Sequence, residues 1–149
     1  MRLSTKGRYA VMAMTDLAAR GEERAVSLAD IASRQEISLS YLEQLFARLR
    51  RGGLVKSVRG PGGGYRLAKS AAETTVAEIV LAVDEPIRAT RCEGRDALRG
   101  CMGGGERCIT HHLWDELSDH IHHFLAGVSL ADVLEKRFAR PAAGAIAAA

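Results

Sequence analysis

The three cysteines of this chain stand close together in its second half. They follow the spacing Cys92-x8-Cys101-x6-Cys108, and His111 comes three residues after the last of them. Glycines lie between them, which lets the connecting segments fold tightly around a bound group. Thiolates and a neutral imidazole are ligands of both zinc and iron-sulfur clusters. The grouping therefore predicts a metal site with four protein ligands.

The spacing alone does not separate an iron-sulfur cluster from zinc. A structural zinc site usually contains a short C-x2–4-C pair, which this sequence lacks, although three cysteines and one histidine form an accepted zinc set. A two-iron, two-sulfur (2Fe-2S) cluster also needs four ligands, and histidine is a documented substitute for cysteine. Both kinds of metal site stay open on these residues.

His111 is the preferred fourth ligand. We expect a helix to begin near Cys108, which would place Cys108 and His111 on one face. His112 would point about 100° away on that helix and ranks second. The histidines further along lie more than two turns away, and we expect them to be exposed or to lie in an interface.

Length and composition indicate a small folded protein. With 149 residues, the chain can form one domain with an appended oligomerisation element. It contains no apolar run of the roughly 18 residues needed to cross a bilayer and no secretory signal at its start, so we expect a cytoplasmic location and no membrane partner. Because three cysteines is an odd number, a disulfide framework is disfavoured. A redox switch that pairs Cys101 with Cys108 remains an alternative, but it leaves His111 without a role.

The charge is unevenly distributed along the chain. Residues 1–70 carry 13 Lys and Arg against 6 Asp and Glu, a net charge of +7, whereas residues 71–149 carry 8 against 12, a net charge of −4. A basic half suggests a polyanionic partner. Since many basic faces are merely solvated, the argument needs an element that could enter a nucleic-acid groove.

The basic half has the order of a helix-turn-helix. Apolar residues at helical spacing predict a first helix that follows Ser4 and Thr5 and extends to Arg20. Ser27 precedes a short helix that ends near Gln35, and Ser38 precedes a third helix that stops at Gly52. The third helix has an apolar stripe and, near its start, short polar residues on the other face. In a helix-turn-helix, such residues contact base edges in the major groove.

A basic hairpin follows directly. LVKSV, residues 54–58, alternates in polarity, GPGGG spans 60–64, and YRL resumes the alternation. Arg59 and neighbouring cations flank the turn, and a glycine-rich tip that starts at Gly60 can lie against a phosphate backbone or in a minor groove. The segment lacks the G-x-x-x-x-G-K-[ST] pattern of a nucleotide-binding loop. A basic hairpin after a helix-turn-helix is the wing of a winged-helix domain.

The second half predicts a helical extension. Thr75 and Glu78 have capping-box spacing and open a helix that completes the first domain. A long helix to Ala126 carries an apolar stripe, and a last helix is expected to about Ala139. The stripe could pack on its own domain, but we prefer a second subunit because winged-helix proteins usually bind two half-sites as dimers. The predicted fold is mostly α with a small β-hairpin: a winged helix-turn-helix DNA-binding domain (1–83), a cluster-binding loop (84–106), a dimerisation helix with the C-terminal helix (107–139) and a flexible tail (140–149).

Several stretches strongly resemble the bacterial winged-helix iron-sulfur sensor family over about residues 1–135. They are MRLSTKGRYAVMAMTDLA, SLADIASRQEISLSYLEQLFARLRRGGLVKSVRGPGGGYRL and the TRC...C...CITHHLW segment. The gaps between the cysteines are longer than in the best-known members. The resemblance implies a homodimeric transcriptional regulator, repressor and activator, that binds double-stranded promoter DNA, receives a 2Fe-2S cluster from the iron-sulfur assembly machinery and regulates iron-sulfur cluster biogenesis genes.

The resemblance also implies roles for particular residues. Three cysteines and one histidine would hold the cluster, and these correspond to Cys92, Cys101, Cys108 and His111. The DNA-binding residues would be those of the recognition helix and the wing: Ser38, Ser40, Tyr41, Glu43, Gln44, Arg59 and Gly60. In this family the residue at Glu43 is implicated in discriminating between two classes of promoter.

We do not expect an enzyme, because no nucleophile-base pair or carboxylate pair stands out. Two other functions remain as alternatives. One is a nitric-oxide- or iron-responsive repressor of the same fold. The other is a constitutive DNA-binding module in which zinc only stabilises the loop.

Overall fold

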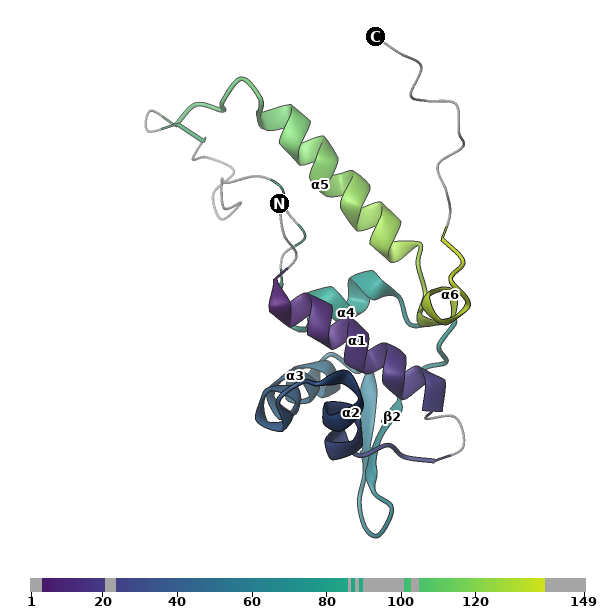
Figure 1. The fold of residues 1–149 in the computed structure, drawn as a ribbon. Coiled ribbons are helices and arrows are strands. Elements are labelled where there is room, and N and C mark those ends of the chain that lie inside the picture. The colour runs from purple at the N-terminus through teal and green to yellow at the C-terminus, as the bar shows by residue number, and fades with distance from the viewer. Residues whose placement is uncertain are drawn as a thin grey trace.

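The computed structural model describes residues 4–20, 24–85, 87, 89, 101, 102 and 105–138. In this part of the chain six helices and one hairpin follow one another, as Figure 1 shows. Their order is α1 (Thr5–Arg20), α2 (Leu28–Gln35), α3 (Leu39–Arg51), β1 (Val55–Val58), β2 (Gly64–Leu67), α4 (Val76–Ala82), α5 (His111–Ala126) and α6 (Leu130–Glu135). The predicted class, mostly helical with a small β-hairpin, is confirmed.

The main core lies between the first three helices and the base of the hairpin. Met14, Leu17, Ile31, Leu42 and Phe46 are fully buried there, and each comes from the apolar face of its helix. Burial of side chains of this size contributes roughly 1.5 to 3 kcal/mol each relative to exposure. Because the apolar face of α3 is packed into this core, its polar N-terminal face points to solvent in a fixed orientation.

The turn between α2 and α3 has the expected chemistry. Ser27 accepts a hydrogen bond from the Asp30 N–H (3.1 Å) at the start of α2. Glu36 ends that helix in the left-handed conformation (φ 53°), and Ile37 buries its side chain in the core. Ser38 then caps α3 by accepting from the Tyr41 N–H. The predicted helix-turn-helix is therefore present with its caps.

The hairpin is an antiparallel pair in which Val55 faces Leu67 and Val58 faces Gly64. Val26 adds a short bridge to Tyr65 through two backbone hydrogen bonds of 2.9 and 2.8 Å. Tyr65 also packs edge-on against Phe46. Strand β2 is thus fixed to the core through Tyr65, and the tip of the hairpin extends beyond the rest of the domain (Figure 1).

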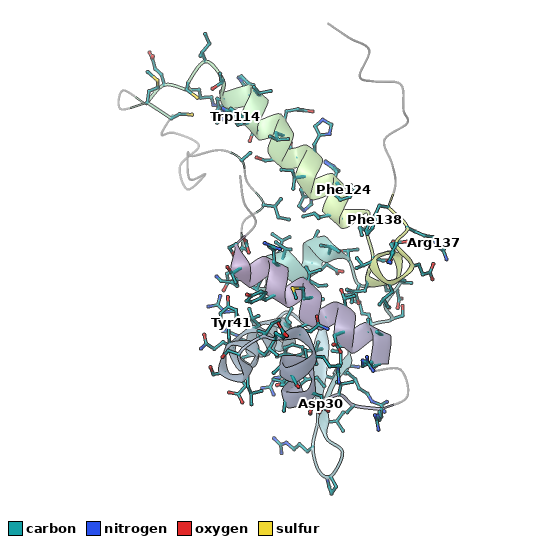
Figure 2. All side chains as sticks on the ribbon, viewed as in Figure 1. Asp30, Tyr41, Trp114, Phe124, Arg137 and Phe138 are labelled. Atoms are coloured by element: carbon teal, nitrogen blue, oxygen red, sulfur yellow. The ribbon has the colours of Figure 1, made fainter. Side chains whose placement is uncertain are left out.

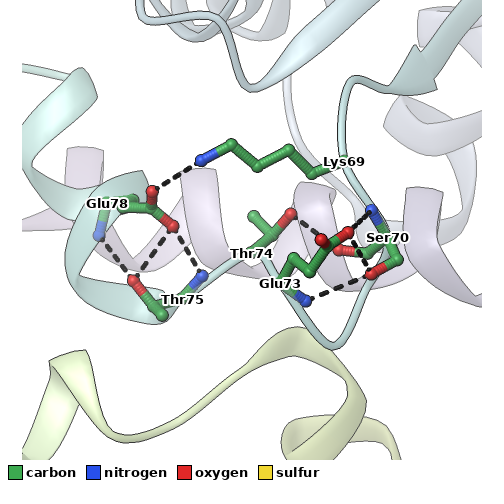
Figure 3. Close-up of polar contacts among 6 residues, drawn as sticks. All are labelled: Lys69, Ser70, Glu73, Thr74, Thr75 and Glu78. Atoms are coloured by element: carbon green, nitrogen blue, oxygen red, sulfur yellow. Dashed lines mark hydrogen bonds and ion pairs between the residues drawn. The ribbon is translucent and has the colours of Figure 1, made fainter.

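The segment between the hairpin and α4 is held by local hydrogen bonds, which Figure 3 shows. Thr75 and Glu78 form the predicted capping box, and the Lys69 ammonium lies 3.0 Å from the Glu78 carboxylate. Glu73 accepts from the Ser70 hydroxyl at 2.7 Å. These contacts fix the start of α4 close to the end of the wing.

The second half departs from the predicted helix bounds at two points. The long helix was expected to begin near Cys108, but α5 begins at His111, because residues 108–111 form a turn in which the His111 N–H donates to the Cys108 carbonyl (2.9 Å). The last helix was expected to reach Ala139, but it ends at Glu135, because Lys136 adopts the left-handed conformation (φ 55°). The two helices are present as predicted, but the predicted start of the first and the predicted end of the second were wrong.

The last two helices pack differently from each other. The N-terminal end of α6 is joined to the first domain, since Leu130 is fully buried in the main core and its N–H donates to the Thr74 carbonyl. By contrast, α5 contacts α4 near its C-terminal end and extends away from the domain (Figure 1).

Candidate nucleic-acid interface and metal centre

The N-terminal part of α3 presents polar groups to solvent. Ser38 and Ser40 are exposed, with their hydroxyl oxygens 3.0 Å apart. Glu43 and Gln44 are exposed on the next turn. Side chains of this kind at the start of a recognition helix can bond base edges in the major groove.

Two neighbouring residues refine the predicted reading face. Tyr41, labelled in Figure 2, is half-buried. It packs edge-on against Tyr9 of α1, so it supports the predicted reading face as well as belonging to it. Leu39 was not predicted to belong to the face, yet it is 43% exposed beside the serines. An apolar side chain there suits a thymine methyl group. The signal in the sequence was that Leu39 falls outside the apolar stripe of α3.

The wing presents Arg59 and Gly60 to solvent at its tip. Gly60 has φ +99°, which favours glycine, and its carbonyl accepts from the Gly63 N–H at 2.9 Å. This tight tip is narrow enough to approach a phosphate backbone. The structure therefore places both predicted wing residues on the same exposed loop.

A buried carboxylate fixes α2 against α1. The Asp16 side chain is only 3% exposed and accepts from Arg34, whose Nη2 lies 2.7 Å from Oδ1, and from the Gln35 amide at 2.7 Å. Nε of Arg20 lies 3.7 Å from the same carboxylate oxygen, Oδ1 of Asp16. Since Gln35 is the last residue of α2, this network sets where the helix-turn-helix turns.

Two of the predicted metal ligands are in direct contact. The Cys101 sulfur lies 3.0 Å from Nδ1 of His111, although ten residues separate them. Cys101 is exposed and His111 is half-buried at the first position of α5. A thiol and an imidazole at this distance need little movement to bind one metal ion.

Cys108 lies nearby in the chain but outside the helix. Its sulfur is 3.8 Å from the Thr110 hydroxyl, and its carbonyl closes the turn onto His111. The expectation that Cys108 and His111 share a helix face was therefore wrong, and a turn joins them instead. Cys92 lies outside the described residues, and among those described no cluster of three or more metal-ligating side chains is formed.

The N-terminal end of α5 and the residues before it carry exposed apolar side chains. Ile109 is fully exposed, Leu113 is 61% exposed and Trp114 is 41% exposed. Figure 2 shows Trp114 at the end of α5 that lies farthest from the DNA-binding domain. A group of exposed apolar side chains at one end of a helix is typical of an interaction site.

Together the capped recognition helix and the basic hairpin define a winged helix-turn-helix DNA-binding protein. The chain belongs to the Rrf2 family, described as iron-dependent transcriptional regulators, whose model matches residues 3–136. It is a DNA-binding transcriptional regulator and not an enzyme.

Individual relatives agree with this assignment. The chain is 58% identical over 144 residues to the HTH-type transcriptional regulator IscR of Photorhabdus laumondii, covering 97% of this chain and 85% of the relative. Among solved structures, T. potens IscR aligns with a TM-score of 0.72 at 36% identity over 95% of this chain and 94% of that one. CymR, the global cysteine regulator of B. subtilis, aligns with a TM-score of 0.74 at 32% identity over 91% and 98%. The resemblance seen in the sequence is confirmed.

None of the described helices combines the length and apolar character needed to cross a bilayer.

Proposed function

We propose that this regulator senses iron-sulfur status and controls genes for iron-sulfur cluster biogenesis. The observation that carries the proposal is the contact between Cys101 and His111, which joins a thiol and an imidazole at the exposed end of α5. The 58% identity to an IscR protein supports the same function. We further propose a cytoplasmic location, where promoter DNA is found in bacteria.

The donor set fits a 2Fe-2S cluster with Cys92, Cys101, Cys108 and His111 as ligands. Three thiolates supply the sulfur ligands that iron prefers, and one neutral imidazole completes the four. The bound cluster would supply a redox-active and labile group that reports iron and sulfide supply. The cluster would come from the iron-sulfur assembly machinery.

A homodimer is the proposed assembly. The exposed apolar side chains of α5 include Leu113, Trp114 and Phe124, and a second copy of this helix would cover them. Two copies would also present two recognition helices to the two half-sites of a promoter. In each copy we propose that Ser38, Ser40, Tyr41, Glu43 and Gln44 enter the major groove, with Arg59 and Gly60 at the minor groove.

The first test compares wild-type protein with His111→Ala, both purified without oxygen. The wild type should show visible charge-transfer bands and about two iron and two sulfide per subunit. Loss of the imidazole should weaken the bands and lower the iron content well below that of the wild type. Absorption spectra with iron, sulfide and zinc analysis measure both effects.

His112→Ala is the matched control, because His112 is an exposed neighbour whose ring lies 5.6 Å from that of His111. It should keep the wild-type spectrum. Colourless wild-type protein with stoichiometric zinc would instead favour a zinc-stabilised DNA-binding module and would reject the proposed function.

A second prediction concerns promoter choice. A glutamate accepts from a cytosine amino group, but it repels phosphate and penalises sites that lack this donor. Glu43→Ala should therefore bind the two promoter classes more equally, with their affinity ratio reduced by roughly tenfold or more, which corresponds to the loss of one base-discriminating contact. Fluorescence anisotropy with one duplex of each class measures the ratio.

The control for this prediction is Glu36→Ala, which removes an exposed glutamate from the turn just before α3. It should leave the ratio unchanged. A Glu43→Ala protein with full wild-type discrimination would contradict the assigned role.

A further inference from the structure

The three residues after α4 are tied to the recognition helix. Arg48, one turn beyond Gln44 on α3, donates from Nη1 to the Val83 carbonyl at 3.3 Å and forms an ion pair with the Asp84 carboxylate. Val83 itself is fully buried in the main core. Residues 83–85 therefore contact α3 through both backbone and side chain.

The same three residues are tied to the start of α1. Glu85 accepts from the Ser4 N–H and hydroxyl, both at 2.6 Å, and from the Gly7 N–H at 2.7 Å. Burial by itself would raise the pKa of Glu85. The hydrogen bonds from Ser4 and Gly7 and the charge of Lys6 outweigh burial, so the pKa lies below its ordinary value. An ionised carboxylate thus occupies the N-terminal end of α1, where the first N–H groups of a helix need acceptors.

The backbone around these contacts is adapted to them. Asp84 adopts the left-handed conformation (φ 57°), which aspartate tolerates better than most residues. Gly7 allows the close approach of Glu85, since a Cβ atom at position 7 would lie 2.5 Å from a Glu85 carboxylate oxygen. We call residues 83–85, with their contacts to Arg48, Ser4 and Gly7, the junction.

We propose that the junction passes the state of the cysteine-bearing segment to the recognition helix, with Arg48, Asp84 and Glu85 as positioning residues. The inference rests on the proposed cluster, because Cys92 follows Glu85 by only seven residues in the sequence. A displacement of residues 83–85 would be transmitted to α3 through Arg48 and to α1 through Glu85. Energetic coupling between two sites can be carried by a chain of packed and hydrogen-bonded residues of this kind.

The junction has the two properties that a coupling element needs. The junction contacts α3 at Arg48, which lies beyond the proposed DNA-contacting residues of that helix. A small shift at Arg48 can therefore tilt the N-terminal part of α3 without exposing the core. In addition, Asp84 is exposed and lies at a left-handed position, so its ion pair with Arg48 can break without leaving a buried charge. The contacts of α1 and α3 with the rest of the core would keep the domain folded.

The test compares cluster-loaded and cluster-free full-length protein for wild type, Asp84→Asn and Arg48→Ala. Asparagine keeps the size and the left-handed conformation of Asp84 but removes its charge. Allosteric coupling usually changes affinity roughly 5- to 150-fold, and we expect the affinity ratio of the two wild-type forms for a promoter duplex to lie in this range. In both variants the ratio should fall toward one while the absorption spectrum shows unchanged cluster content.

The two substitutions should act through one contact. The double variant Arg48→Ala with Asp84→Asn should therefore decouple the protein no more than either single change. Lys69→Ala is the matched control, since it removes an ion pair to Glu78 of comparable exposure outside the junction (Figure 3). It should keep the wild-type ratio.

Two outcomes would overturn the inference: a wild-type ratio in Asp84→Asn, or a ratio that falls only in step with lost cluster. Amide hydrogen exchange of residues 39–44 in cluster-free protein gives a readout that needs no cluster. Asp84→Asn should speed this exchange and Lys69→Ala should not, and equal rates in both variants would reject the positioning role. Colourless wild-type protein would reject the proposed cluster, and the exchange rates would still decide whether the junction positions α3.

Discussion

Gly64→Ala is expected to destabilise the protein by at least about 3 kcal/mol, because it combines a strained backbone with a clash in the fold. Gly64 has φ +153°, a conformation that L side chains rarely adopt. A Cβ atom there would lie 2.8 Å from the Ser27 nitrogen and closer still to the Val26 carbonyl, and all of these are backbone atoms. Single domains are stable by only about 5 to 15 kcal/mol, so a loss of this size removes a large part of the free energy of unfolding.

The damage should fall on the wing. The Val26 carbonyl accepts from the Tyr65 N–H at 2.8 Å, and this bond must break or shift to make room for a methyl group. Chemical denaturation followed by circular dichroism measures the free energy of unfolding. The affinity for a promoter duplex reports whether the wing still contacts DNA.

Gly53→Ala is the control for strain alone. Gly53 also has a left-handed φ, of +73°, but a Cβ atom at this position would have no atom within 4 Å apart from those of its neighbours in the chain. It should lose only about 1 to 2 kcal/mol, the usual cost of an L residue in this conformation. Equal losses in the two variants would show that the clash at Gly64 is relieved without cost.

The helices and the wing could be predicted because their signals are local. Ser27, Ser38 and Thr75 each cap a helix at the position expected from the sequence, and the GPGGG segment forms the tip of the hairpin. The ends of α5 and α6 could not be predicted as well. The turn before His111 and the left-handed Lys136 depend on backbone conformations that no single residue type dictates there.

The candidate site divides in the same way. The exposed polar face of α3 follows from helical periodicity, and the wing follows from its glycine-rich basic turn. Donor chemistry places Cys101 and His111 in one predicted metal site, but the sequence paired His111 with Cys108, whereas the structure brings the Cys101 sulfur to 3.0 Å from Nδ1 of His111. The junction could not be predicted, since Glu85 contacts residues 78 and 81 positions away and neither motif nor period connects them. Leu39 could have been found by asking which apolar residue lies off the buried stripe.

Asp16→Ala is expected to destabilise the protein by roughly 2 to 4 kcal/mol and to weaken DNA binding. Breaking a buried ion pair usually costs about 3 to 5 kcal/mol, and the partial exposure of Arg34, 30%, reduces this figure. The substitution leaves the Arg34 and Gln35 donors without their carboxylate. Because Gln35 ends α2 at the turn before α3, the recognition helix should lose its fixed orientation. Glu135→Ala, which breaks an exposed ion pair with Arg137, should cost less than about 1 kcal/mol.

The contribution of Asp16 should also depend on pH in a definite direction. Burial raises the pKa of Asp16, but hydrogen bonds from Arg34 and Gln35 and the charges of Arg34 and Arg20 outweigh it, so the pKa lies below its ordinary value of 3.8. A lowered pKa means that ionisation stabilises the folded state fully above the ordinary value, and that this stabilisation is lost as the pH falls from there through the folded-state pKa. The difference in unfolding free energy between wild type and Asp16→Asn, which keeps the shape but cannot ionise, should therefore be constant near neutral pH and shrink below about pH 4. A difference that stayed constant into acid would mean that shape and hydrogen bonding, and not the charge of Asp16, hold α2 against α1.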